Sequence, residues 1–285
     1  LLPRAGHLPG GRRAAGCVAS MRAPTPSQWA AIRAADRHLL VAAGAGTGKT
    51  TTVVGRILYL LGVPFDGDRH PSPVTLDRIA AITYTNAAAA DLKRKLREEL
   101  REAGLRDQAY EVDNARIGTI HGFCGDILRE SALRSGRSPG FEVLEEGEGG
   151  ALLAEAVRDA LVTAVGEDRT PGLQELLSVH RQRDVEGFVC RLAEDADRLA
   201  RMQRDATLPL EEGALVRLAV RAREVLERRL DERGAVDFDR MISWTRDLLR
   251  DDPAVRRRLQ RRLHTLIVDE FQDVDPLQKE IAWLL

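Results

Sequence analysis

Short, continuous apolar runs alternate along this chain with longer segments whose apolar residues recur at helical spacing. The runs predict buried strands, and the spaced segments predict helices that pack on them. In chain order they are strand 39–42, helix 48–61, strand 79–84, helix 87–103, strand 115–120, helix 123–134 and strand 266–268. Because strands buried on both faces and separated by helices are typical of parallel sheets, we expect an α/β fold.

The middle of the chain has a different pattern. From about residue 140 to 233 no run is typical of a strand, and the apolar residues of 151–161 and 215–230 recur at helical spacing. The glycine-containing stretch 136–150, with Pro139, marks its start, and Gly234 marks its end. We therefore predict a first α/β part over 22–138, an all-helical insertion over 139–233 and a second α/β part over 234–285.

Composition narrows the class of protein. Of the 285 residues 44% are hydrophobic and 31% are charged, which excludes disorder over the whole length. No apolar run reaches the roughly 18 residues of a membrane-spanning helix, so we expect no membrane association. The net charge of −1 excludes a generally basic protein, although a local basic surface would still suffice for nucleic acid. Three widely spaced cysteines predict neither a disulfide framework nor a zinc site and favour the reducing cytoplasm.

Neither end of the sequence has the pattern expected of a natural chain terminus. Residues 1–20 contain no acid and are rich in Gly, Arg and Ala, which fits a leader upstream of a start at Met21 or, alternatively, a transit peptide. The other end, 281–285, lies inside an apolar run without a helix stop signal. We expect a fragment, and we treat 1–21 as a disordered or non-native leader.

The segment Ala43–Thr50 is the strongest chemical signal. It follows a predicted strand and opens a predicted helix, and its glycines allow backbone N–H groups to close around phosphate oxygens. Lys49 would reach the β- and γ-phosphates, and the Thr50 hydroxyl would ligate Mg²⁺. The sequence therefore predicts a nucleotide site whose phosphate-binding loop comprises Ala43, Gly44, Ala45, Gly46, Thr47, Gly48, Lys49 and Thr50.

Two adjacent carboxylates follow the last predicted strand. Ligands of open α/β sheets bind at the carboxyl ends of strands, where Asp269 could hold Mg²⁺ directly or through water. Glu270 could orient and deprotonate an attacking water molecule. Lys49 and Asp269 are far apart in the chain but must meet one nucleotide, which again indicates an inserted subdomain.

Five segments occur in an order that resembles a known family. They are Gln28, the phosphate-binding loop, 82–88, 118–123 and 269–273, and the series resembles the N-terminal half of the UvrD/Rep/PcrA branch of superfamily 1 helicases. The segments 120–124, 141–145 and 236–239 are more similar to the RecB/AddA recombination nucleases within that branch. The resemblance covers residues 22–285 and implies a RecA-like P-loop NTPase domain.

The resemblance also implies an activity and its residues. The whole protein would be an ATP-dependent 3′→5′ DNA helicase or translocase that acts on single strands and duplex junctions in repair and recombination. Gln28 would contact adenine, Thr51 would help to hold the triphosphate, Asp269 would bind Mg²⁺, Glu270 would be the catalytic base and Gln272 would sense the γ-phosphate. The residues matching the DNA-contacting motifs are Tyr84, Thr85, Asn86, Thr119, His121 and Phe123.

Several alternatives stay open at this stage. The second motor domain of such helicases is absent from the sequence, so we expect weak ATP binding and poor hydrolysis by this chain alone. It could instead be a non-hydrolysing, ATP-gated DNA-binding module, or an unrelated P-loop ATPase or kinase. A RecB/AddA-like protein would contain a nuclease domain and would work with a partner subunit. A simple UvrD-like protein would have neither a nuclease domain nor a partner subunit.

Individual residues also have simpler interpretations. Tyr84 could pack in the core, and His121 could be structural. For Cys124 we expect a small buried residue. Lys93, Arg94 and Lys95 could belong to a basic track or to an ordinary solvated helix face.

Overall fold

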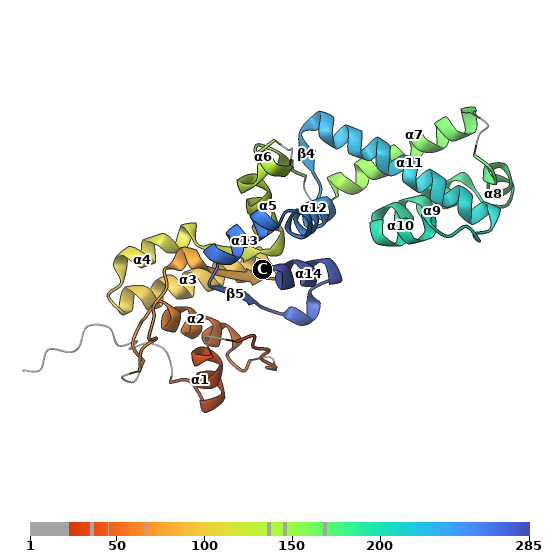
Figure 1. Cartoon of the computed structure of the whole chain (residues 1–285). Coiled ribbons are helices and arrows are strands. Elements are labelled where there is room, and N and C mark those ends of the chain that lie inside the picture. Colours follow the sequence, from red (N-terminus) through yellow and green to blue (C-terminus); the bar gives the residue numbers. More distant parts are fainter. Residues whose placement is uncertain are drawn as a thin grey trace, which may run out of the picture. The chain divides into compact units, whose positions relative to one another are not determined.

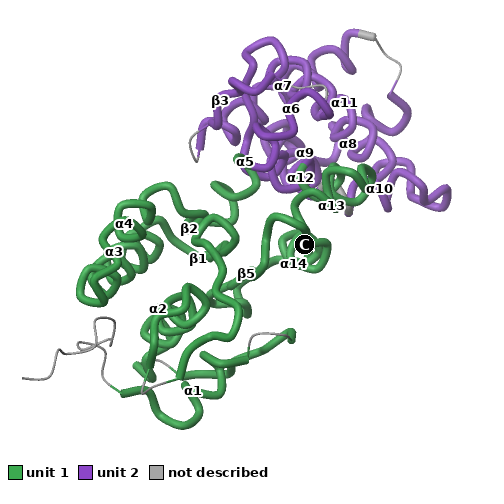
Figure 2. Tube along the Cα trace, turned by 60° about the vertical axis from the view of Figure 1, so that its left-hand side comes forward, with its two compact units in different colours: residues 1–126, 245–285 green, residues 127–244 purple. Residues whose placement is uncertain are grey.

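The computed structural model divides the chain into two compact units. Unit 1 comprises 1–126 and 245–285, and unit 2 comprises 127–244 (Figure 2). The chain passes into unit 2 within helix α5 (Ile120–Glu130) and returns within α12 (Phe238–Asp251). The residues that the structure describes are 23–34, 37–44, 46–65, 68–135, 138–144, 147–167 and 170–285.

A three-stranded parallel sheet organises unit 1 (Figure 1). Its strands are β1 (Ile79–Thr83), β2 (Arg116–Thr119) and β5 (Thr265–Val268), in the order β2-β1-β5. Ile82 lies opposite Gly118 on one side and Val268 on the other, and all five residues of β1 are buried. Three of the four predicted strands, and the parallel α/β character, are therefore confirmed.

Helices cover this sheet and supply most of the core of unit 1. The predicted helices 48–61 and 87–103 appear as α2 and α3, and their apolar faces pack with β1 around Ile57, Leu96 and Leu100. The α-helices of unit 1, besides its parts of α5 and α12, are α1 (Pro26–Arg33), α2 (Lys49–Leu60), α3 (Asn86–Glu102), α4 (Arg106–Glu111), α13 (Pro253–Arg262) and α14 (Pro276–Leu284). Short 3₁₀ turns are η1 (Leu76–Arg78), η2 (Val112–Asn114) and η3 (Phe271–Asp273).

The prediction of a buried strand at 39–42 is wrong for the described structure. Leu39–Ala42 is neither a strand nor paired with one, and the Leu40 side chain is 81% exposed. A strand needs a neighbour that satisfies its backbone N–H and C=O groups. Among the described residues β5 pairs only with β1, and Leu39–Ala42 does not add to its other edge.

Helices dominate unit 2. Small side chains such as Ala156, Ala160 and Ala219 lie in its core and allow α7 and α11 to pack closely, while Leu218 and Leu230 fill the remaining space. Besides its parts of α5 and α12, its helices are α6 (Ala132–Ser135), α7 (Glu148–Glu167), α8 (Leu173–Val179), α9 (Gln182–Glu194), α10 (Ala196–Gln203) and α11 (Leu210–Arg233).

Two features of unit 2 differ from the predicted all-helical insertion over 139–233. Unit 2 contains a parallel pair of two-residue strands, β3 (Glu142–Val143) and β4 (Ala235–Val236). Two residues are too short to produce a recognisable hydrophobic period. The unit also starts earlier and ends later than 139–233, because α5 and α12 continue into it. Across the described parts of both units, no helix combines the length and the apolar character needed to cross a bilayer.

Candidate functional site

The phosphate-binding loop ends where α2 begins. Gly46 and Gly48 have φ values of 74° and 86°, in the left-handed region that favours glycine. A Cβ atom on Gly48 would lie 2.8 Å from Gln28 Nε2 and would push the Gln28 amide away from the loop. The Thr47 hydroxyl donates a hydrogen bond of 2.8 Å to the Gly44 carbonyl and closes the turn. Ala43 is exposed beside it, and Ala45 lies outside the described residues.

Gln28 is held against this loop from α1. Its Nε2 donates to the Thr47 carbonyl at 3.0 Å, while its Oε1 accepts from the Thr25 backbone N–H at 2.8 Å. The second of these bonds is half of a capping box that starts α1. The side chain is therefore positioned both by its own helix and by the loop.

The two carboxylates leave β5 in a constrained turn. The Asp269 N–H donates to the Ile82 carbonyl at 2.8 Å and so extends the pairing of β5 with β1. Glu270 follows with φ 50° and ψ 46° and is the one non-glycine residue with positive φ in the described chain. Such a backbone costs on the order of 1–3 kcal/mol and recurs at functional sites. This backbone conformation turns the chain directly after β5, at the two acidic residues.

Lys49 and Glu270 form an ion pair across the site. Lys49 Nζ lies 2.6 Å from Glu270 Oε1, and Gln272 Nε2 donates to Glu270 Oε2 at 2.6 Å. The hydrogen bond to Glu270 raises the pKa of Lys49. The hydrogen bonds from Lys49 and then Gln272 lower the pKa of Glu270. Both groups therefore stay charged at neutral pH, and Gln272 touches the predicted base directly.

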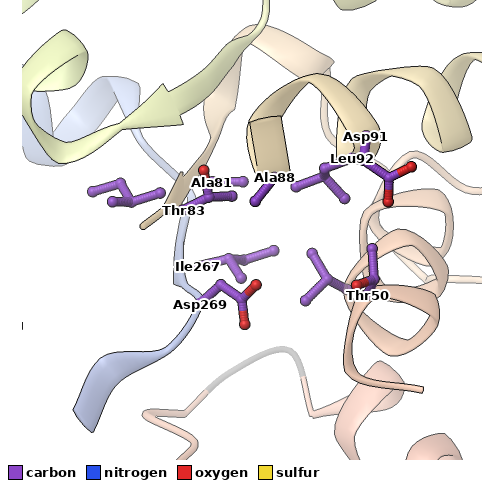
Figure 3. A pocket seen from close by; sticks show the side chains of 10 residues that line it. Thr50, Ala81, Thr83, Ala88, Asp91, Leu92, Ile267 and Asp269 are labelled. Atoms are coloured by element: carbon purple, nitrogen blue, oxygen red, sulfur yellow. The ribbon is translucent and has the colours of Figure 1, made fainter. Parts of the chain in front are cut away.

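Thr50 and Asp269 line one pocket (Figure 3). Thr50 comes from the first turn of α2 and Asp269 directly follows β5, so a hydroxyl and a carboxylate line the same pocket. Oxygen donors of this kind are what Mg²⁺ prefers, and the pair fits the predicted metal role. Thr51, the next residue of α2, is exposed. The lining residues are Thr50, Val53, Ala81, Ile82, Thr83, Ala88, Asp91, Leu92, Ile267 and Asp269.

Asp91 belongs to this pocket and was missed by the sequence analysis. It lies one helical turn after Ala88, which also lines the pocket, and that period was the available signal. Lys95 and Arg94 bind its carboxylate at 2.7 and 2.6 Å, and their hydrogen bonds lower its pKa. Asp91 is thus an anion at the pocket wall whose charge is balanced by Arg94 and Lys95 of the same helix.

The first predicted DNA-contacting segment leaves the carboxyl end of β1. Tyr84 is 70% exposed, so the alternative of a core tyrosine is wrong. The Thr85 hydroxyl accepts from the Ala88 N–H at 3.1 Å and caps α3, and Asn86 is exposed at the first position of that helix. These three side chains therefore lie together at one end of the sheet.

The second such segment leaves the neighbouring strand β2. Thr119 lies opposite Thr83 in the sheet, and its hydroxyl accepts from the Gly122 N–H at 3.3 Å as α5 begins. His121 is half-buried in the first turn of α5. The carboxyl ends of the two strands are adjacent, so Thr119 and His121 lie on the same end of the sheet as Tyr84.

Phe123 departs from its predicted role. Its side chain is only 5% exposed, because Phe123 shares the buried face of α5 with Ile127 at helical spacing. A ring in this position does not offer a face to a nucleic-acid base. The expectation for Cys124 is confirmed: it is buried, and burial raises the pKa of its thiol to about 12.

Comparison with known proteins identifies the family of the chain. The profile of the UvrD/REP helicase N-terminal domain matches residues 24–285. The chain is 39% identical over 145 residues (48% of its length) to a protein of Anoxybacillus flavithermus that is named as one subunit of an ATP-dependent helicase/nuclease, and it covers 11% of that protein. Proteins of the same name from Moorella thermoacetica and Desulforamulus reducens are 39% and 34% identical over 44% and 56% of the chain, which covers 9% and 13% of them. The chain thus spans about a tenth of the length of these relatives.

Proposed function

Because this chain belongs to the UvrD/REP helicase N-terminal domain family, we propose that it is the nucleotide-binding part of an ATP-dependent DNA helicase that acts in repair and recombination. One observation carries the proposal. Lys49 and Glu270 meet at 2.6 Å at the carboxyl end of the sheet, although the helical unit separates them in the chain. A RecA-like P-loop fold accounts for this convergence of loop, acids and parallel strands.

ATP would bind over the start of α2. The first N–H groups of that helix have no partner within the helix and would donate to phosphate oxygens. Lys49 would leave Glu270 and bind the β- and γ-phosphates, and Gln28 would contact the base. Mg²⁺, held by Thr50 and Asp269, would neutralise part of the phosphate charge when bound.

Glu270 would act as the base once Lys49 has moved away. Its carboxylate would accept a proton from the water that attacks the γ-phosphorus, while the bond to the ADP oxygen breaks. General bases of this kind contribute about 10²–10⁴-fold to a rate. Gln272 is hydrogen-bonded to Glu270. A movement of Glu270 on loss of the γ-phosphate would therefore be transmitted directly to Gln272.

Single-stranded DNA would bind at the same end of the sheet. The exposed Tyr84 ring suits stacking on a base of any sequence, and Thr85, Asn86, Thr119 and His121 suit contacts to the sugar-phosphate backbone. β1 carries Tyr84 and Thr85 at its end and pairs directly with β5, which carries Asp269. Hydrolysis and strand contact would thus be linked through neighbouring strands of one sheet.

The direction of movement and the partners are part of the same proposal. We expect 3′→5′ translocation into a duplex junction. The relatives are named as subunits of a helicase/nuclease, so we also expect the full-length protein to work with a second helicase–nuclease subunit.

Unwinding of tailed duplexes by the full-length protein tests this proposal. We expect MgATP-dependent separation of a duplex with a 3′ single-stranded tail and little separation with a 5′ tail. Lys49→Ala should abolish it, and Arg250→Gln, an exposed change outside the site, should not. Unwinding from the 5′ tail would contradict the polarity, and equal separation without ATP would contradict the motor function.

A further inference from the structure

Helix α13 carries a one-sided basic surface that the nucleotide and strand sites do not use. The segment 253–264 holds five arginines and one histidine but no acid. Val255 and Leu259 bury one face of the helix, and Arg257, Arg258, Arg261 and Arg262 are exposed. Residues four apart lie side by side on a helix, so these four arginines form one continuous strip.

Some exposed arginines elsewhere in unit 1 pair with acids of their own helix. On α3, Arg94 pairs with Asp91 and Glu98, which supports a solvated face there rather than a basic track. On α12, Arg250 pairs with Asp247 and Asp251. Within the part of the chain that the structure describes, the side chains of Arg257 and Arg261 have neither an ion pair nor a hydrogen bond.

A further arginine joins the strip at its carboxyl end. The Arg78 side chain donates to the carbonyls of Arg262 and Arg261 at 3.5 Å, and the His264 N–H donates to the Arg78 carbonyl at 2.8 Å. We call Arg78, Arg257, Arg258, Arg261 and Arg262 the arginine strip. Arg78 precedes β1 and α13 precedes β5, so the strip lies at the amino ends of these strands, as Figure 1 shows for α13. Lys49, Asp269 and Tyr84 lie at the opposite ends.

Helix electrostatics explains only part of this arrangement. Cations in the last turn of a helix interact favourably with its dipole, which accounts for Arg261 and Arg262. Arg257 lies before that turn, and adjacent like charges repel one another. A bound polyanion would relieve this repulsion, and guanidinium groups are suited to paired hydrogen bonds with phosphate.

We propose that the arginine strip binds the phosphate backbone of single-stranded DNA, at a surface separate from the strand-contacting residues. The inference rests on the proposed DNA-dependent function. From Arg257 to Arg262 the helix rises about 8 Å, enough to reach about two successive phosphates. The contact is independent of base sequence and supplies affinity, and it takes no part in hydrolysis.

The salt dependence of binding tests the proposal. The double variant Arg257→Gln/Arg261→Gln of the full-length protein is titrated with a labelled oligothymidylate at several salt concentrations. Arg229→Gln/Arg250→Gln is the matched control, because it removes two positive charges that have acidic partners. Circular dichroism and unfolding temperature verify that both variants fold.

We expect the slope of log affinity against log salt to become shallower by about 1.4 in the strip variant and to stay unchanged in the control. Between about 50 and 200 mM salt, wild-type affinity should therefore fall about sevenfold more than that of the variant. The rate of ATP hydrolysis at saturating DNA should be unchanged. If the wild type binds DNA but the variant keeps its slope, the strip proposal is overturned. If the wild type binds no DNA, the proposed function fails as well.

Discussion

The carboxyl end of the sheet in unit 1 and the α7–α11 core of unit 2 use their residues in opposite ways. The sheet end gathers charged and exposed groups, with Lys49 and Glu270 paired and Tyr84 open to solvent. The helical core gathers Ala and Leu residues that are almost completely buried. Substitutions at the sheet end should therefore change activity with little effect on stability. Substitutions in the helical core should change stability with little effect on activity.

The largest effect on the activity side should come from Glu270→Gln. The amide cannot accept the proton from water, so we expect ATP turnover to fall about 10²–10⁴-fold while nucleotide binding persists. Steady-state hydrolysis and equilibrium binding of a labelled nucleotide measure the two effects. Glu98→Gln, which changes an exposed carboxylate paired with Arg94, is the control. A large drop in unfolding temperature for Glu270→Gln would contradict the claim that the sheet end has little effect on stability.

The corresponding change on the stability side is Leu230→Ala. Leu230 is fully buried in α11, so its truncation should lower the free energy of unfolding by about 2–5 kcal/mol. Urea denaturation followed by circular dichroism measures this. Leu133→Ala, at a position 96% exposed on α6, should change it by less than about 0.5 kcal/mol. Loss of nucleotide affinity in folded Leu230→Ala protein would show that the two regions are not separable.

Tyr84→Ala should produce a smaller effect, confined to DNA. Loss of one stacked base costs about 1–3 kcal/mol, which is about 5–150-fold in affinity for single-stranded DNA. Because Tyr84 is largely exposed, stability and DNA-independent hydrolysis should change little. Fluorescence anisotropy with an oligonucleotide measures the affinity. Tyr84→Phe, which keeps the ring, should retain most of it, and equal weakening by both variants would argue against stacking.

The smallest effect should be on pH dependence. The hydrogen bonds from Lys49 and Gln272 lower the pKa of Glu270, so the ion pair persists below the usual titration range of a glutamate. A carboxyl group with a lowered pKa stabilises the fold above its unfolded pKa, and this stabilisation is lost as pH falls through its folded pKa. Because the pair is partly exposed, the stability change should be slight. Titration of the Glu270 carboxyl by NMR in wild type and Lys49→Ala should show a higher pKa in the variant.

The sequence predicted the parts of this fold whose signals are local. Apolar runs identified β1 and β5, a shorter mixed segment identified β2, and the glycines and Lys49 identified the start of α2. Leu39–Ala42 carries the same local signal but pairs with no strand among the described residues, and whether a segment pairs cannot be read from a local pattern. β3 and β4 were not predicted, because strands of two residues are too short to show a hydrophobic period.

The candidate site shows the same division. Residue types and spacing predicted Lys49 and Glu270, but not that they bind one another, because their contact depends on the complete fold. Phe123 was assigned by its motif, although its place on the apolar face of α5 buries it. A helical projection of α5 would have found that conflict before the structure did.

The most direct test of the central claim is the rate of ATP hydrolysis by the full-length protein with and without single-stranded DNA, with Lys49→Ala as the inactive reference. The account predicts slow hydrolysis without DNA, a strong increase with it, and loss of both rates in the variant. Tight ATP and DNA binding without turnover would instead identify an ATP-gated binding module. Hydrolysis that ignores DNA would contradict the helicase function.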